Sequence, residues 1–146
     1  MRVSRTLMGL AAALGAVFTL SAASAGPPAR APVAELLGTG LRGASGSTPG
    51  PGGALYIAEG AAGRVSRVDP MTGQVTTFAS GLPAAVGAIG GPIDIAFIGK
   101  TAYVLVTLVG PDVGGSNVVG LYRVDGPDRF TVIADIGAFS LRHPPK

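Results

Sequence analysis

The sequence contains no cysteine, and only 13% of its 146 residues carry a charged side chain. Without cysteine, no disulfide supports the fold and no lipid can be attached through a thioether. The single histidine, His143, has no companion at metal-ligand spacing, which excludes a zinc site. Basic residues are scattered and aromatic residues reach only 5%, so no nucleic-acid partner is expected.

Glycine and proline are abundant instead, with 24 and 12 residues, and hydrophobic residues make up 47% of the chain. The apolar residues fall into short runs that glycine and proline bound, which is the pattern of strands and turns. Disordered chains combine many such residues with low hydrophobicity, which is not the case here. The composition therefore predicts an all-β protein whose core consists of Val, Ile, Leu and Ala.

The N-terminus has the pattern of an export signal. Arg2 and Arg5 precede an uncharged apolar run at residues 7–20, and Ala23-Ser24-Ala25 provides a small-x-small cleavage site. The alternative is an uncleaved anchor, but a spanning helix needs about 20 apolar residues and this run is shorter. We therefore predict a signal peptide at 1–25, a secreted, extracytoplasmic product and no membrane association after cleavage.

A proline-rich linker at residues 26–32 follows the predicted cleavage site. Cleavage would also remove two basic residues and lower the formal net charge from +3 to 3 − 2 = +1. The basic isoelectric point of the whole sequence therefore says little about partners.

Short strands recur from residue 54 onward. Strands are expected at 54–58, 64–69 and 74–79, after a glycine- and proline-rich turn region at 47–53. A second unit contains a hairpin of 92–98 and 101–107 around Gly99-Lys100, followed by strands at 120–125 and 130–134. The second unit also has an inserted loop at 108–117.

The two units belong to a repeat. Residues 33–41 resemble residues 75–82, an offset of 75 − 33 = 42, and a period of 40 to 50 with four short strands is typical of propeller blades. We predict a partial β-propeller of about two four-stranded antiparallel blades at 33–139, led by a lone strand at 33–41. A disordered tail at 140–146 should follow. An antiparallel sandwich is the alternative fold.

A propeller closes with four or more blades. Two blades therefore indicate a truncated propeller, or a ring that is completed by self-association through exposed strand edges.

Several segments carry a family resemblance, namely GGALYIAE at 52–59, GRVSRVD at 63–69, GPIDIAF at 91–97 and GLYRVD at 120–125. The chain resembles the ScyD/ScyE family and, more generally, NHL-type propeller repeats, over residues 33–139. The resemblance implies an exported propeller and no defined reaction.

Two carboxylates are candidates for metal binding. Propellers of the gluconolactonase type hold calcium in the central channel through oxygen ligands, and Asp94 and Glu59 are the two candidate residues for facing such a channel. The favoured interpretation of Asp94 is a carboxylate that accepts backbone N–H bonds between blades. For Glu59 the alternative to metal binding is a solvated turn residue.

The repeated Arg-Val-Asp at 67–69 and 123–125 predicts a structural role. Asp69 and Asp125 should accept N–H bonds in the turns that follow, while Arg67 and Arg123 pack along the outer sheet face.

Two functions remain open. The first is a binding or assembly module that holds a small molecule, glycan or protein with the inserted loop, through Asp112, Ser116 and Asn117. The second is a fragment of a channel-centred, calcium-dependent hydrolase or lactonase-like enzyme. The first is favoured, because no catalytic residue emerges and an enzyme of the second kind needs three or four converging oxygen ligands.

Overall fold

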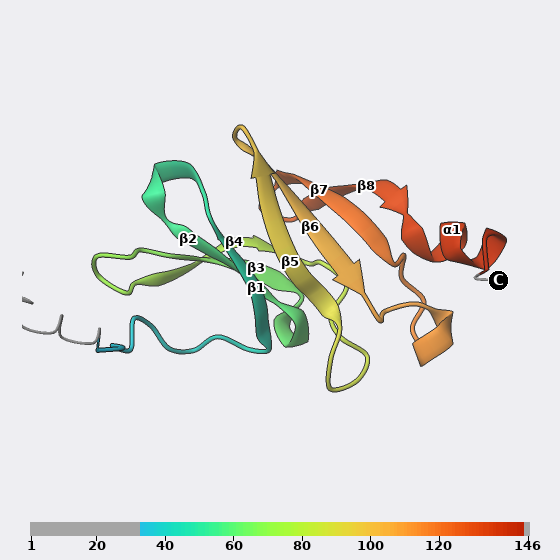
Figure 1. The fold of residues 1–146 in the computed structure, drawn as a ribbon, viewed down its shortest axis with the longest axis horizontal. Coiled ribbons are helices and arrows are strands. Elements are labelled where there is room, and N and C mark those ends of the chain that lie inside the picture. The colour runs from blue at the N-terminus through green and yellow to red at the C-terminus, as the bar shows by residue number, and fades with distance from the viewer. Residues whose placement is uncertain (1–32, 145–146) are drawn as a thin grey trace, which may run out of the picture. The chain divides into compact units, whose positions relative to one another are not determined.

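The computed structural model describes residues 33–144, so the predicted signal peptide and the linker at 26–32 lie outside the described residues. The described part contains eight β-strands, three short 3-10 turns and one α-helix (Figure 1). Within it, no helix is both long enough and apolar enough to cross a membrane.

The strands form two four-stranded sheets in which neighbouring strands run antiparallel and follow the order of the chain. The first sheet contains β1 (Ala44–Pro49), β2 (Leu55–Glu59), β3 (Arg64–Val68) and β4 (Val75–Ser80). The second contains β5 (Gly91–Ile98), β6 (Thr101–Thr107), β7 (Gly120–Gly126) and β8 (Arg129–Asp135). These two meanders are the predicted pair of blades.

Alternation of buried and exposed positions explains why these segments form strands. Along β6, Ala102, Val104 and Val106 are buried while the residues between them are partly exposed, as expected for a strand with one face in the core. At the turn before β6, Gly99 adopts a positive φ of 62°, which permits the tight reversal into the hairpin.

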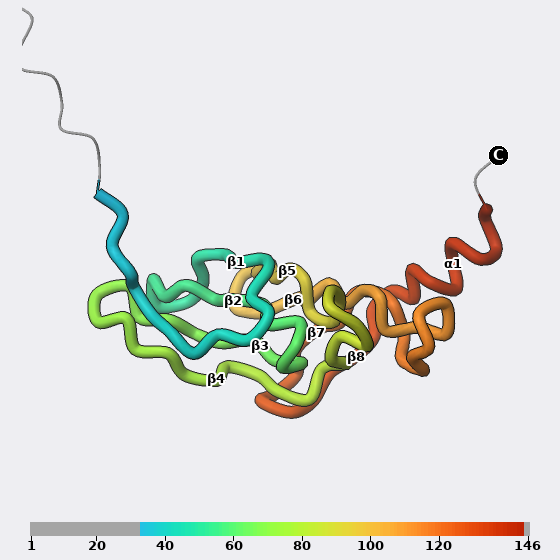
Figure 2. The backbone as a smooth tube through the Cα atoms, turned by 90° about the horizontal axis from the view of Figure 1, so that it is seen from below, coloured from blue at the N-terminus to red at the C-terminus, as the bar shows by residue number. Residues whose placement is uncertain are grey.

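The two sheets pack against each other through a shared apolar core. Strands β1 and β5, the first strand of each sheet, lie side by side (Figure 2). Tyr56 of the first sheet contacts Phe97 of the second with ring centroids 4.7 Å apart, and Phe78 packs edge-on to Tyr56 at 4.9 Å. At the outer strands, the Ser80 N–H donates to the Pro127 carbonyl at 2.8 Å, which joins β4 to the β7–β8 turn.

Two expectations for the start of the fold were wrong. Residues 44–49 form strand β1, although their Gly, Ser and Pro content indicated a turn region from residue 47. The strand predicted at 33–41 is absent from the described residues, because no neighbouring strand pairs with this segment. Instead, Gly38 lies close to the Gly73 carbonyl and the Val75 side chain, so the segment runs across the first sheet.

The C-terminal expectation was wrong in part. Helix α1 (Ile136–Arg142) extends into the tail that was predicted to be disordered from residue 140. Asp135 caps the helix by accepting a hydrogen bond from the Ala138 N–H at 2.7 Å. This local cap explains the ordered turn up to Arg142.

Candidate functional site

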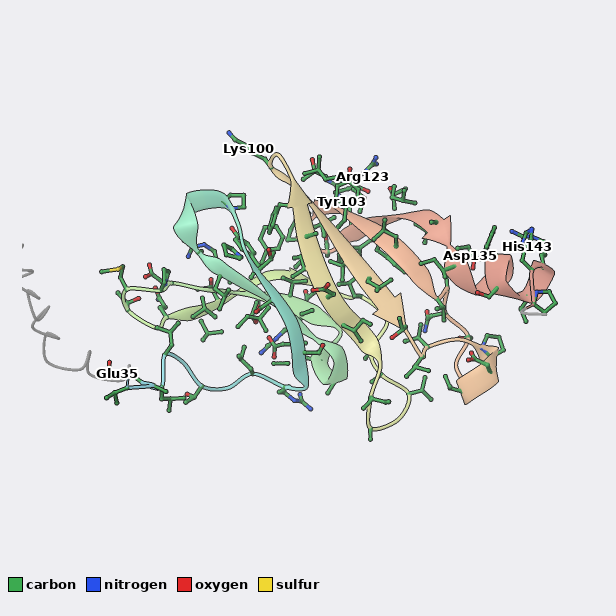
Figure 3. All side chains as sticks on the ribbon, viewed as in Figure 1. Glu35, Lys100, Tyr103, Arg123, Asp135 and His143 are labelled. Atoms are coloured by element: carbon green, nitrogen blue, oxygen red, sulfur yellow. The ribbon has the colours of Figure 1, made fainter. Side chains whose placement is uncertain are left out.

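The two longest connections, 81–90 between the sheets and 108–119 within the second sheet, lie at one end of the strands, which we call the loop end. It consists of the start of β1, the 3-10 turn η2 (Gly60–Ala62), the connection 81–90 and the connection 108–119, which contains η3 (Pro111–Val113). At the opposite end the strands are joined by shorter turns, one of which carries Lys100 (Figure 3). Because binding residues collect on loops that a rigid scaffold carries, the loop end is the natural place for a site.

The first pocket at the loop end lies between the two blades and measures about 200 Å³. Its lining comes from four segments and consists of small residues and two isoleucines: Gly43, Ala44, Ser45, Gly60, Ala61, Ala85, Ala88, Ile89, Gly90 and Ile93. No charged side chain lines it, and Ser45 contributes the one hydroxyl. We call this the inter-blade pocket.

A second pocket of about 350 Å³ adjoins it and shares Ala88 and Ile89. Val86, Gly87, Leu108 and Val113 complete its apolar lining. Leu108 has a φ of 52° and is the sole non-glycine residue with positive φ in residues 33–144. Such strained residues are concentrated at functional sites.

Glu59 ends β2, directly before Gly60 of the pocket lining, and is fully buried. Arg64 binds its carboxylate in a bidentate manner, with Nε 2.8 Å from Oε1 and Nη2 3.0 Å from Oε2. The Ser66 hydroxyl donates to Oε1, and the Arg42 N–H donates to Oε2 at 2.6 Å. Both carboxylate oxygens therefore have protein donors, which corrects the expectation of a solvated turn residue.

These donors also determine the charge state of Glu59. Burial alone would raise the pKa of the carboxyl group, but the hydrogen bonds from Arg64, Ser66 and Arg42, with the positive charge of Arg64, outweigh it. The pKa of Glu59 therefore lies below its ordinary value, and the residue is an ion at neutral pH.

Asp94 occupies a different environment. It lies on the edge strand β5 next to an irregularity in the pairing with β6, and its side chain is exposed. Its Oδ1 accepts the Ile95 N–H at 2.9 Å, and Gly46 of β1 packs directly against it. The bond is to its own strand, so the expected hydrogen bond to a neighbouring blade is wrong, although the contact with the neighbouring blade is present.

The structure does not bring Asp94 and Glu59 to one site. Glu59 is on β2, where its oxygens face β3 and the segment before β1, whereas Asp94 is an exposed residue of β5 in the second sheet. Among residues 33–144, no three His, Asp or Glu side chains are grouped closely enough to hold a metal ion.

The residues predicted for the binding loop lie at the loop end but outside both pocket linings. Asp112, Ser116 and Asn117 are exposed, and Asp112 lies in the first turn of η3. The same loop contributes Leu108 and Val113 to the second pocket, so its apolar rather than its polar residues face the cavity.

Of the two turn contacts predicted for the repeated Arg-Val-Asp, that of Asp69 is confirmed and that of Asp125 is wrong. Asp69 accepts the Met71 and Thr72 N–H groups at 2.8 and 3.2 Å in the turn after β3. Asp125 instead pairs with Arg123 at 2.6 Å and accepts the Thr131 hydroxyl at 2.5 Å. β7 continues to Gly126, so Asp125 is still within the strand and its carboxylate meets neighbouring side chains rather than turn amides.

Sequence reasoning missed the small residues of the inter-blade pocket. Gly60, Ala85 and Ala88 carry no functional group, so no chemical motif identifies them. A weak signal was present in the uninterrupted run of small and apolar residues at 84–91.

Comparison with known proteins supports the fold. No family model matches the chain, and no curated protein matches it. Among solved structures, the PQQ-bound form of an aldose sugar dehydrogenase from Streptomyces coelicolor is similar, with a TM-score of 0.53 and 20% identity. The match covers 69% of this chain and 31% of that chain, so this chain spans about a third of its length. The likeness supports the propeller-type fold, and the fold alone.

Proposed function

We propose that the chain is an exported propeller module that binds a small, uncharged ligand in the inter-blade pocket. The observation that carries this proposal is the lining of the pocket, where four segments from two blades converge with small residues and no charged side chain. Ligand sites are concave, mostly apolar and supplied with few polar groups. The Ser45 hydroxyl and nearby backbone groups would orient the ligand.

The small residues favour a flat ligand that approaches the backbone closely. Gly43, Gly60 and Gly90 add no side chain to the lining, and the Gly60 N–H and carbonyl are already bonded to Gly43 and Ala85, so the wall presents mainly apolar surface. The adjoining second pocket extends the apolar surface toward Val86 and Val113, both of which are partly exposed. An uncharged ligand with one apolar face would fill both cavities.

Two features of the proposal rest on the sequence. The N-terminal pattern of Arg2, Arg5 and Ala23-Ser24-Ala25 supports export. The repeated segments, with GRVSRVD at 63–69 and GLYRVD at 120–125 among them, support membership of the ScyD/ScyE family.

Titration with the uncharged apolar dye Nile red, followed by NMR of backbone amides, tests the site. We expect shifts at residues 43–45, 60–61 and 85–90, and loss of binding in the Ala88→Trp variant, whose ring fills the pocket. Ala96→Trp is the matched control, because Ala96 is also an exposed alanine but lies on β5 and lines neither pocket. Shifts confined to other surfaces would contradict the proposal.

A calcium-dependent, channel-centred enzyme is the second candidate, and the exposed carboxylate of Asp94 is the observation that favours it. A ligand that binds only the folded state raises the melting temperature. A rise of several degrees with calcium that Asp94→Asn abolishes would support this candidate, and an unchanged melting temperature would reject it.

A further inference from the structure

The turn that follows Glu59 connects three walls of the inter-blade pocket. The Gly60 N–H donates to the Gly43 carbonyl at 2.9 Å, and the Gly60 carbonyl accepts the Ala85 N–H at 3.0 Å. Gly43, Gly60 and Ala85 all line the pocket. One residue therefore joins the segment before β1, the β2–β3 turn and the connection 81–90.

Hydrogen bonds of Glu59 hold both sides of this turn. Its carboxylate accepts the Arg42 N–H, one residue before Gly43, and binds Arg64 and Ser66 of β3 on the other side of the turn. Arg64 Nη2 also approaches the Gly40 carbonyl at 3.4 Å. The segment before β1 is thus held to the sheet on both sides of Arg42.

We propose that Glu59 is the positioning residue of the inter-blade pocket, through which the three pocket walls are held in one arrangement. It does not line the pocket, and it acts through Gly60 and Arg42. This role rests on the proposed binding function. Removing the charge loosens residues 42–45, 60–61 and 85 together, and an arrangement preorganised for a ligand is lost.

Hydrogen exchange of single amides in the full chain tests the coupling without any ligand. Glu59→Gln keeps the shape of the side chain but replaces the carboxylate by a neutral amide. The charge-assisted hydrogen bonds from Arg64 and from the Arg42 N–H are thereby weakened or lost. Hydrogen bonds to charged groups contribute more than neutral ones, so we expect exchange at Arg42, Gly60 and Ala85 to rise by about tenfold or more. The Val104 amide in the buried strand β6 should keep its rate.

Asp125→Asn is the matched control, because Asp125 also pairs with an arginine and a hydroxyl but lies on β7, away from the pocket. It should leave the three amides unchanged. If hydrogen exchange at Val104 rose equally, Glu59 would stabilise the whole fold rather than the pocket walls, and the proposal would be overturned. Faster exchange at Arg42 alone would also overturn it, because the walls would then not be coupled. If Glu59→Gln fails to fold, Arg64→Lys, which keeps the charge but loses the bidentate contact, should accelerate the same three amides.

A binding measurement separates this role from the proposed function. We expect Nile red to bind Glu59→Gln at least several-fold more weakly than the unchanged chain. Unchanged affinity together with faster exchange would reject the positioning role and leave the binding site standing. Absence of dye binding to the unchanged chain would reject the proposed site, while the exchange data would still decide whether the walls are coupled.

Discussion

Glu59 and Asp94 show how the same functional group serves different purposes in different surroundings. Glu59 is fully buried, and its oxygens have donors from Arg42, Arg64 and Ser66. Asp94 is exposed and accepts one bond from the backbone of its own strand. A buried carboxylate that lost its partners would be strongly destabilising, whereas an exposed one can exchange protein donors for water.

The ion pair of Glu59 makes stability depend on pH. The pKa of Glu59 is held below its ordinary value of 4.5, so the folded state favours the charged form more than the unfolded state does. The stabilisation is fully present above that ordinary value and is lost as pH falls through the lower, folded pKa. We therefore expect the free energy of unfolding, measured with urea, to fall as the pH is lowered from neutral to about pH 3. The fall should be smaller in Glu59→Gln than in the unchanged chain.

Other carboxylates titrate in the same range, which is why the comparison needs the variant. Hydrogen bonds also lower the pKa of Asp69 and Asp125, and the unchanged chain and Glu59→Gln both retain these two groups. The difference between the two curves therefore isolates Glu59. Parallel curves would show that the buried pair contributes no pH-dependent stability.

Single-residue roles could be predicted where partners are close in the sequence. Asp69 bonds to Met71 and Thr72, two and three residues away, so the turn pattern identified its role. Arg42 lies 17 residues before Glu59, and no local pattern indicates that its N–H meets the carboxylate. Burial of Glu59 depends on the path of the segment before β1, which the sequence does not specify.

At the scale of elements, the turn η2 is the most restricted part of the site. A Cβ added at Gly60 would overlap the carbonyl oxygen of Gly90 and crowd the carbonyl carbon of the same residue. Forcing extra atoms into a packed region costs about 1–3 kcal/mol. We expect Gly60→Ala to lower the free energy of unfolding by at least about 1 kcal/mol and to weaken Nile red binding.

Gly87→Ala is the control for the loss of stability. Gly87 lies in the connection 81–90, has no positive φ, and a Cβ added there would meet no other atom within 4 Å. Replacing such a glycine changes stability little, or raises it by up to about 1 kcal/mol by reducing the freedom of the unfolded chain. Chemical denaturation of both variants provides the measurement. Equal stability of the two variants would contradict the close approach of η2 to Gly90.

Seven of the eight strands were predictable because their apolar residues alternate or cluster between glycines and prolines. The prediction of 101–107 coincides with β6, whose buried residues repeat at every second position. Strand β1 was not predicted, because its Ser, Gly and Pro residues are typical of turns. The strand forms through pairing with β2 and contact with β5. Tertiary contacts here override local propensity.

At the scale of the whole molecule, the repeat period predicted two blades, and the structure confirms them. The placement of the pockets could not be predicted, because it depends on how the connection 81–90 crosses between the blades. The periodic sequence pattern predicts the strands of a blade. The path of a loop depends instead on contacts with residues distant in the sequence, such as Gly60 with Ala85, and no local pattern predicts these.

The outermost strands of the two blades differ in a way that bears on association. β4 exposes Thr76, Thr77 and Ser80, and none of its large apolar residues is exposed. β8 exposes six of its seven residues, and Val132 and Ile133 keep 41% and 46% of their surface accessible. Edge strands with apolar residues favour pairing with another chain, whereas polar edges resist it.

We therefore expect any self-association of this chain to use β8 rather than β4. Val132→Lys places a charge in the middle of β8 and should shift sedimentation toward the monomer. Thr76→Lys makes the corresponding change on β4 and should leave the sedimentation profile as it was. If both variants associate like the unchanged chain, the contact lies elsewhere, and a ring completed through the outer edge of the second blade is rejected. A chain that is monomeric throughout the micromolar range would reject self-association itself, and the two blades would then act alone.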